Sequence, residues 1–300
     1  MDRFATYQLL VRVVELGSFT RAAQELGLGQ PAVSKQIAAL EASIGARLVE
    51  RTSRGLRPTP AGLDLYNSAV RLLDDLDEIE GRVRSGNLGP AGLVRVATPP
   101  VLGRMFIIPK LSSFLSQFPE VEIEFTVAQR RVDLVKDGID VALRVGHLKS
   151  SSLVARKIGT MQMVTVAAPS YLADHGTPLT PRELANHRLI VGQTDGAALD
   201  WQFKGDDGAF SITPSGSLRS DDGEDLRASV LAGIGLLHGP MALLYGDIQE
   251  GRVVRILEAF APDAVPIHAV SMSGRKMPPR VRVFVDFLAA TFAAEPALSP

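Results

Sequence analysis

Residues 17–41, GSFTRAAQELGLGQPAVSKQIAALE, decide the fold of the N-terminal part of this chain. Ser18 and Thr20 can accept hydrogen bonds from the free backbone N–H groups of a helix start. The glycines of ELGLGQ permit a tight turn. Pro31 suits the first turn of a following helix, because that turn does not use its N–H groups. The stretch therefore predicts two short helices joined by a glycine turn.

The second of these helices has two different faces. Val33, Ile37, Leu40 and Ile44 recur at helical spacing, which predicts an apolar stripe packed on a core. The opposite face lacks acidic groups and consists of Gln30, Pro31, Ser34, Lys35 and Ala38. Side chains of these kinds can reach base edges and phosphates in a DNA major groove. We therefore expect this face to recognise DNA. The alternative is an ordinary pair of helices whose polar face is exposed to solvent and binds nothing.

Arginines gather just after this helix, at positions 47, 51, 54 and 57. They end in GLRPTPAG, which favours a short β-hairpin wing that contacts the DNA backbone. An amphipathic helix is expected before the pair, with Phe4, Tyr7, Val11 and Val14 on one face. Residues 1–58 are thus predicted to form a winged helix-turn-helix. The predicted DNA-binding residues are Ser18, Thr20, Gln30, Pro31, Ser34, Lys35, Arg51, Arg54 and Arg57.

This N-terminal segment resembles the DNA-binding domain of LysR-type transcriptional regulators. The matching runs are GSFTRAA, QPAVSKQIAALE, IGARLVERT and LRPTPAG. Gly29 stands where that family typically has a serine, and glycine is also an acceptable N-cap residue. The resemblance implies binding to double-stranded promoter DNA.

Charge is distributed unevenly along the 300 residues, whose formal net charge is −1. Residues 1–60 hold eight Arg and Lys against five Asp and Glu, whereas residues 61–88 hold three against six. A local basic module on a near-neutral chain favours sequence-specific DNA binding over general coating of nucleic acid.

Cysteine is absent, which excludes disulfides, thiolate zinc sites and thiol redox sensing. We find neither a signal-peptide core nor an apolar run near the ~20 residues that span a bilayer, so a cytoplasmic protein without membrane contact is expected.

Residues 59–90 are predicted to form a long linker helix and a hinge. Apolar residues recur in it at alternating spacings of four and three, namely Leu65, Ala69, Leu72, Leu76, Ile79 and Val83. Such a heptad seam favours dimerisation through this helix, and the alternative is packing on the core of its own domain. SGNLGPAG at 85–92 then ends the helix. LysR-type proteins dimerise through a helix in this place, so a homodimer or homotetramer is expected.

From residue 91 to 300, apolar strand patterns alternate with helical ones, the rhythm of a doubly wound parallel sheet. The runs VDLVKDGIDVALRVGHLKSSSLVAR, APSYLADHG and PLTPRELANHRLI resemble the effector-binding domain of the LysR family. That resemblance implies a bilobal α/β domain with the fold of periplasmic binding proteins. Lobe I is expected at 91–161 and 269–293, and lobe II at 162–268.

Catalytic motifs are missing: we find no G-x-S-x-G elbow, P-loop or H-E-x-x-H, and the five histidines lack metal-ligand spacing. No catalytic residue, metal or cofactor is therefore predicted. Asp221 and Asp222 are either a carboxylate pair or, more consistently with their position, the cap and negative charge at a helix start. Trp201 fits a core and a cleft equally well.

An effector site is expected where the two lobes face each other. The turn from Thr98 to Gly103 should open the first helix of its lobe, and free N–H groups there favour an anion, such as a small organic acid. The predicted effector-binding residues are Thr98, Pro100, Val101, Leu102, Gly146, His147, Gln193, Thr194, Trp201, Ser220 and Asp221.

The expected function is that of a DNA-binding transcriptional regulator controlled by a small-molecule effector. A solute-binding protein or an enzyme on the same bilobal fold is the alternative. The DNA module and the missing signal peptide argue against the first of these, and the missing catalytic constellations argue against the second.

Overall fold

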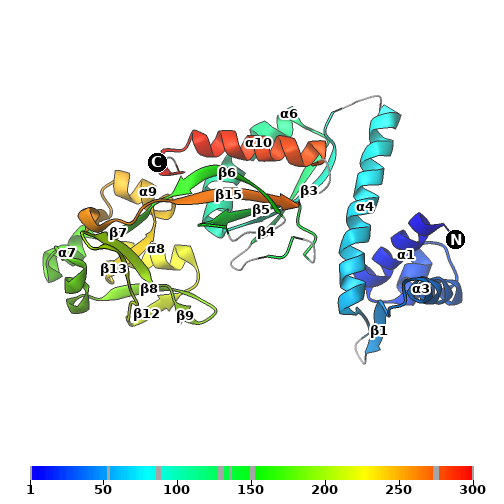
Figure 1. The fold of residues 1–300 in the computed structure, drawn as a ribbon, viewed down its shortest axis with the longest axis horizontal. Coiled ribbons are helices and arrows are strands. Elements are labelled where there is room, and N and C mark those ends of the chain that lie inside the picture. Colours follow the sequence, from blue (N-terminus) through cyan, green and yellow to red (C-terminus); the bar gives the residue numbers. More distant parts are fainter. Residues whose placement is uncertain are drawn as a thin grey trace.

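A long helix joins a small N-terminal unit to a larger α/β region with two lobes (Figure 1). The structure is a computed structural model that describes residues 2–52, 55–85, 89–127, 132–134, 137–148, 153–272 and 277–298. In the view of Figure 1, the long helix α4 stands between the remainder of the N-terminal unit and the two lobes. The architecture agrees with the predicted winged helix-turn-helix, linker helix and bilobal domain.

The N-terminal unit consists of three helices and a hairpin: α1 (Arg3–Leu16), α2 (Phe19–Glu25), α3 (Gln30–Ile44), β1 (Val49–Thr52) and β2 (Gly55–Pro58). Ser18 caps α2 by accepting a hydrogen bond from the Arg21 N–H, as predicted. Helix α3 follows Gly29 and ends at Gly45, whose φ of 78° is in the left-handed region. The core of the unit consists of Leu9, Leu10, Val13, Ala22, Ala23, Val33, Ile37, Leu40, Leu48 and Leu56.

Two residues of the predicted apolar stripes lie outside this core. Phe4 and Ile44 are each 45% exposed. Phe4 lies in the first turn of α1, and Ile44 is the last residue of α3, where the chain turns away at Gly45. The helical spacing was therefore right, but each stripe is one residue shorter than predicted.

Helix α4 (Pro60–Ser85) has the predicted extent and starts against the wing. The Thr59 hydroxyl donates to the Arg47 carbonyl at 2.6 Å and accepts from the Gly62 N–H at 3.0 Å. Gly62 lies so close to the wing that a Cβ atom there would be 1.8 Å from the Leu48 carbonyl oxygen. Further along α4, Ala69 and Leu73 pack against Val11 of α1 in the same chain.

Lobe I is built on a five-stranded sheet with the order β4-β3-β5-β15-β6. Its strands are β3 (Gly92–Thr98), β4 (Val121–Val127), β5 (Val141–Val145), β6 (Leu153–Met161) and β15 (Val265–Met272). Helices α6 (Leu111–Gln117) and α10 (Pro279–Ala293) bury aromatic residues against it, including Phe114, Phe284 and Phe292.

Lobe II is built on a sheet with the order β12-β8-β13-β7-β14. The strands are β7 (Met163–Ala167), β8 (Leu189–Thr194), β12 (Leu218–Ser220), β13 (Leu236–Pro240) and β14 (Val254–Ile256), with the short β9 (Ala197–Ala198) beside β8. The helices are α7 (Pro169–His175), α8 (Gly223–Leu231) and α9 (Met241–Gln249). A separate hairpin consists of β10 (Trp201–Gly205) and β11 (Gly208–Ile212).

The sheets are mixed, which corrects the prediction of a doubly wound parallel sheet. Strands β3, β4 and β5 run parallel, but β15 is antiparallel to both β5 and β6. In lobe II, β7 is antiparallel to β13 and β14. The reason is the crossing between lobes: Gln162 alone separates β6 from β7, so the chain enters lobe II as an extended strand without an intervening helix.

The return crossing lies earlier in the chain than the sequence-based boundary. Strand β15 begins at Val265, which pairs with Met161 at the end of β6. Residues 265–268 therefore belong to the sheet of lobe I rather than to lobe II. After α10, Ala297 and Leu298 also pack into the lobe I core.

The first helical segment of lobe I is irregular. It consists of α5 (Pro100–Leu102), a π-turn at Gly103–Ile107, a 3-10 turn at Ile108–Lys110 and then α6. Pro109 cannot donate a backbone hydrogen bond, which helps to explain the break. The run PRELAN likewise forms a 3-10 turn, Pro181–Asn186.

Candidate functional sites

The predicted DNA-binding face is formed by the start of α3. Pro31 and Lys35 are exposed, and Gln30 and Ser34 are partly buried. Thr20 on α2 and Arg57 on β2 are also exposed, whereas the Ser18 hydroxyl is engaged in capping α2. Arg54 and the side chain of Arg51 lie outside the described residues. The described part of the face thus presents one lysine and several hydrogen-bonding groups at the start of a helix.

A cavity of about 720 Å³ lies between the two lobes. Its lobe I wall is formed by Pro99, Pro100, Val101, Leu102, Val145 and Met161. Its lobe II wall is formed by Met163, Gly192, Gln193, Thr194, Asp195, Gly196, Leu199, Ser220, Asp221, Gly223, Leu226 and Pro240. The first wall is apolar, and the second carries the hydrogen-bonding and charged groups.

Seven of the predicted effector-binding residues line this cavity: Pro100, Val101, Leu102, Gln193, Thr194, Ser220 and Asp221. Gly146 and His147 do not line it, although the preceding Val145 does. Thr98 is buried beneath the wall, with its hydroxyl 3.1 Å from the Pro99 carbonyl oxygen. Its methyl group contacts Gly103, where a Cβ atom would come within 2.9 Å.

Trp201 also lies away from the cavity. Its side chain is 2% exposed and stacks on His238 in the lobe II core, with ring centroids 5.5 Å apart. Of the two alternatives that the sequence left open, the structure places Trp201 in the core. We therefore remove it from the candidate site.

The turn at Thr98–Gly103 is a poorer anion site than the sequence indicated. Helix α5 has three residues, with Pro99 at its N-cap and Pro100 in its first turn. Prolines have no N–H group, and the Gly103 N–H already donates to the Pro99 carbonyl at 3.2 Å. Few backbone donors are left to hold an anion at this position.

Several wall residues were missed by the sequence analysis, above all Met161 and Met163. They flank Gln162, the residue that joins the lobes, so the cavity reaches the crossing itself. Asp195 was also missed, in a turn where its φ is 51°. The methionines look like ordinary strand residues, and the sheet pairing is what brings them to the cleft.

The start of helix α8 lies at the cavity, because Asp221 and Gly223 line it. Asp222 is the N-cap of α8 and accepts hydrogen bonds from the N–H groups of Glu224 and Asp225 at 2.8 and 3.3 Å. Of the two alternatives for Asp221 and Asp222, the structure therefore agrees with a helix cap rather than a carboxylate pair. Ser220 donates to the Asp225 carboxylate at 2.8 Å and accepts from the Asp222 N–H at 3.1 Å.

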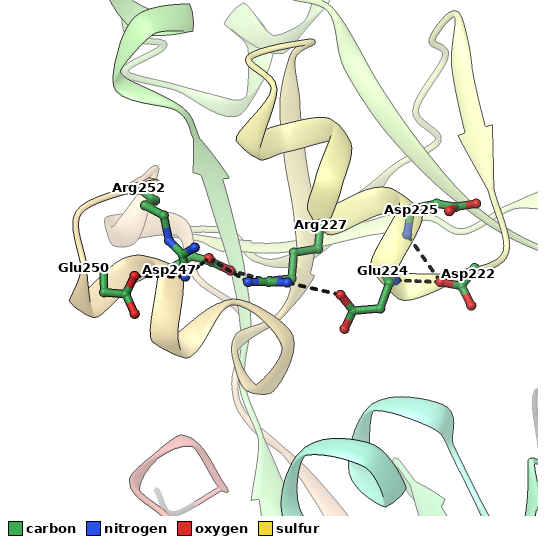
Figure 2. A network of polar contacts seen from close by, with 7 residues as sticks. All are labelled: Asp222, Glu224, Asp225, Arg227, Asp247, Glu250 and Arg252. Atoms are coloured by element: carbon green, nitrogen blue, oxygen red, sulfur yellow. Dashed lines mark hydrogen bonds and ion pairs between the residues drawn. The ribbon is translucent and has the colours of Figure 1, made fainter.

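A buried carboxylate holds α8 against α9. Asp247 is 1% exposed and receives hydrogen bonds from Arg227 at 2.6 and 2.9 Å and an ion pair from Arg252 at 2.7 Å. Figure 2 shows Arg227 lying between Asp247 and Glu224. The hydrogen bonds to Asp247 raise the pKa of Arg227 above its ordinary value. This network holds α8, the helix that Asp221 precedes by two residues.

A buried histidine lies in the lobe II core. His238 contacts the Thr165 hydroxyl at 2.9 Å through Nδ1 and packs between Trp201 and Phe203. Burial lowers the pKa of His238 to about 4, because a charged imidazolium would lose its hydration there.

The N-terminal unit meets lobe I through polar groups. Arg71 on α4 donates to the Leu134 carbonyl at 3.4 Å. Beside this contact lies a cavity of about 210 Å³ whose lining includes Glu15, Arg95 and Glu124. Polar contacts of this kind leave the two units energetically separable.

Within the described ranges, no helix is both long enough and apolar enough to cross a bilayer. The same residues contain no group of three histidine or acidic side chains placed to hold a metal ion.

Two family models match this chain. Residues 4–63 match the bacterial regulatory helix-turn-helix protein of the lysR family, and residues 87–293 match the LysR substrate binding domain. An HTH-type transcriptional regulator of Xanthomonas campestris is 36% identical over 93% of this chain and 83% of its own length. A Pseudomonas aeruginosa protein described as an HTH-type transcriptional repressor is 31% identical, over 99% of this chain and 95% of its own.

Solved structures show the same arrangement. CrgA, a LysR-type transcriptional regulator from Neisseria meningitidis, aligns with a TM-score of 0.63 and 31% identity over 95% of this chain and 97% of its own. The full-length virulence activator AphB from Vibrio cholerae aligns with a TM-score of 0.62 and 28% identity over 97% and 99% of the two chains.

Proposed function

The chain belongs to the LysR family of transcriptional regulators, and on that premise we propose that a small molecule bound between the two lobes controls its binding to promoter DNA. The observation that carries the proposal is the cavity of about 720 Å³, because both lobes and the crossing between them contribute to its wall. Family membership sets aside the alternatives of a solute-binding protein and an enzyme.

The start of α3 is the proposed reader of bases. Gln30 and Ser34 can donate to and accept from base edges, and Lys35 can contact phosphate. Arg57 on the wing, with Arg51 and Arg54 nearby in the sequence, would add contacts to the backbone that are independent of sequence.

Two substitutions separate these roles. Gln30→Ala should relax base preference, at a cost of about 1–3 kcal/mol for a good base contact. Arg57→Ala should weaken binding to all duplexes and reduce the dependence of affinity on salt. Footprinting and gel shifts at matched salt would measure both, and a Gln30→Ala footprint like that of the wild type would move the reading face away from the start of α3.

Lobe closure is the proposed link between ligand and DNA. A ligand that contacts Val101 in lobe I and Asp221 in lobe II binds more tightly when the lobes are closed, so it shifts the population toward that state. Because α4 contacts lobe I through Arg71, a change in lobe orientation can reach the DNA-binding unit along this helix.

Assembly of a homodimer or homotetramer through α4 is also proposed. The predicted seam is divided between two environments: Ala69 packs on α1 in the same chain, whereas Ile79 is 49% exposed. Leu65 packs partly on the winged-helix core, Leu72 and Leu76 are half-buried, and the side chain of Val83 lies outside the described residues. Ile79 is therefore the seam residue best placed to meet a second copy.

Sedimentation of two variants tests this assignment. Ile79→Asp should release smaller species and weaken operator binding, because a charge would enter the dimer contact. Leu63→Asp is the matched control, since Leu63 is also exposed on α4 but lies off the seam. An unchanged mass for Ile79→Asp would rule out dimerisation at this part of the helix.

The function as a whole is tested by gel shift with DNA from the protein's own promoter region, with and without candidate ligands. Met163→Trp would fill the cavity at the crossing, so it should abolish the ligand response while DNA binding remains. A response retained in this variant would place the sensing site elsewhere.

A further inference from the structure

The two walls of the cavity differ in chemistry in a way that selects a ligand. The lobe I wall offers no side-chain hydrogen-bonding group, since it consists of prolines with Val101, Leu102, Val145 and Met161. Apolar walls of this kind receive the carbon skeleton of a ligand and gain from its burial. The polar end of the ligand must therefore face lobe II.

The lobe II wall carries negative charge. Its polar side chains are Gln193, Thr194, Asp195, Ser220 and Asp221. Among the described residues that line the cavity, there is no lysine, arginine or histidine. The aspartates of this wall would repel a carboxylate or phosphate on the ligand, whereas they would attract a cationic group.

The backbone N–H groups at the start of α8 already bind a carboxylate of the protein itself. The N–H groups of Glu224 and Asp225, which could hold a ligand carboxylate, donate to Asp222 instead. With the prolines at the start of α5, the starts of α5 and α8 are therefore poor sites for an acid.

Asp221 differs from the acidic residues around it. Asp222 caps α8, Glu224 pairs with Arg227, and Asp225 accepts from Ser220. Asp195 has a polar partner as well. Asp221 is exposed and lines the cavity, and no hydrogen bond or ion pair to it occurs within the described part of the chain.

We infer that the cavity takes an amine: a ligand whose ammonium group binds the Asp221 carboxylate while its apolar body lies on the lobe I wall. The inference rests on the proposed function, because it names the class of ligand for that same cavity. It replaces the small organic acid that the sequence indicated.

Matched small molecules, tested on the full-length protein, show which charge on the ligand the cavity prefers. Phenethylamine, phenethyl alcohol and phenylacetate share one apolar body and differ in the polar end, and hexylamine, hexanol and hexanoate do the same with an aliphatic body. Methionine-methyl NMR locates the binding, since Met161 and Met163 line the cavity, whereas Met105 and Met277 do not. The amines should shift the first two signals at about tenfold lower concentration than the alcohols, as a hydrogen bond to a charged group requires.

Asp221→Asn should remove this preference, so that the amine and the alcohol bind alike. Asp207→Asn is the control, because it changes the net charge equally on the hairpin between β10 and β11, away from the cavity. The inference is overturned if the acids bind as tightly as the amines, if none of the amines shifts Met161 or Met163, or if Asp221→Asn keeps the preference.

Failure of the proposed function would look different. An acid that binds the cavity and alters the promoter gel shift would leave the regulator intact and overturn the choice of an amine. A protein that binds amines but never binds its promoter DNA would overturn the proposed function and leave the ligand class standing.

Discussion

Asp247 shows how a single buried charge can set the position of a site that it does not touch. It bridges Arg227 on α8 and Arg252, and it is nearly without solvent contact. Replacing this carboxylate weakens its hydrogen bonds to two arginines, and a hydrogen bond to a charged group contributes about 1.5–3 kcal/mol. The carboxylate is therefore expected to matter for stability and for the cavity wall together.

We predict that Asp247→Asn lowers the free energy of unfolding by about 2–3 kcal/mol, because hydrogen bonds between charged groups are lost. The control is Glu250→Gln, because Glu250 pairs with the same Arg252 at 3.0 Å but is solvent-exposed, and exposed pairs contribute less than about 1 kcal/mol. Urea denaturation monitored on both variants gives the comparison. Equal losses would mean that the buried network does not hold α8 against α9.

His238 makes a pH-dependent contribution to stability. Its folded-state pKa of about 4 lies below the ordinary value of 6.5, so the unfolded chain binds a proton more readily than the folded chain. Neutral His238 therefore contributes its full stabilisation when the pH is above the pKa of the unfolded chain. This contribution is lost as the pH falls toward the pKa of the folded protein.

Between about pH 7 and pH 5, the wild type should therefore lose about 2 kcal/mol more stability than His238→Gln, since one pKa unit corresponds to about 1.4 kcal/mol. Denaturation curves at each pH measure this difference. His147→Gln, at an exposed histidine, should follow the wild type. Parallel pH profiles for wild type and His238→Gln would contradict the assignment.

Residue by residue, the sequence predicted the turns better than the interior. Pro100, Val101, Ser220 and Asp221 lie next to strand ends, where a pattern of strands indicates a cleft. Burial of Trp201 depends on the hairpin folding over His238, and local sequence contains no sign of that. The same applies to Met161 and Met163, which reach the cavity through strand pairing between distant segments.

At the scale of elements, close contact between the linker helix and the wing depends on one glycine. Gly62→Ala should place a methyl group against the Leu48 carbonyl, so α4 must shift away from the wing. We predict a loss of about 2 kcal/mol or more in the stability of the N-terminal unit, in the range of overpacked cores.

The same substitution at Gly246 in α9 is the control, because nothing lies within 4 Å of the added methyl group. Alanine in a helix is favoured over glycine by up to about 1 kcal/mol, so Gly246→Ala should be neutral or stabilising. Thermal melts of the two variants test the pair. A harmless Gly62→Ala would show that α4 can adjust without leaving the wing.

Helices were predictable from sequence where one periodic face meets a single core, as in α3 and α10. Strand direction was not, because β15 and β7 owe their antiparallel pairing to the route of the chain between lobes. The start of α5 was predicted from its prolines, but the interruption of the helix by the π-turn at Gly103–Ile107 was not.

Considered as a whole, the molecule has hydrophobic cores that its two units do not share. The clusters of the N-terminal unit end at Leu73, and those of the lobes begin at Val94. Calorimetry of the full chain should therefore show two unfolding transitions. A ligand of the cavity should raise the transition of the lobes and leave the other in place. A single cooperative transition that moves with ligand would contradict this separation.

The crossing between the lobes has a mechanical consequence. The outgoing chain passes from β6 to β7 through Gln162, whose carbonyl accepts from the Met241 N–H at 2.8 Å, and the returning β15 is paired beside it from Val265. We expect two extended segments fastened side by side to act as a flexure that bends mainly about one axis. Different ligands would then stop the lobes at different points along a single coordinate. Because the chain contains no cysteine, spin labels on Gln117→Cys and Asp207→Cys would read that coordinate as one distance.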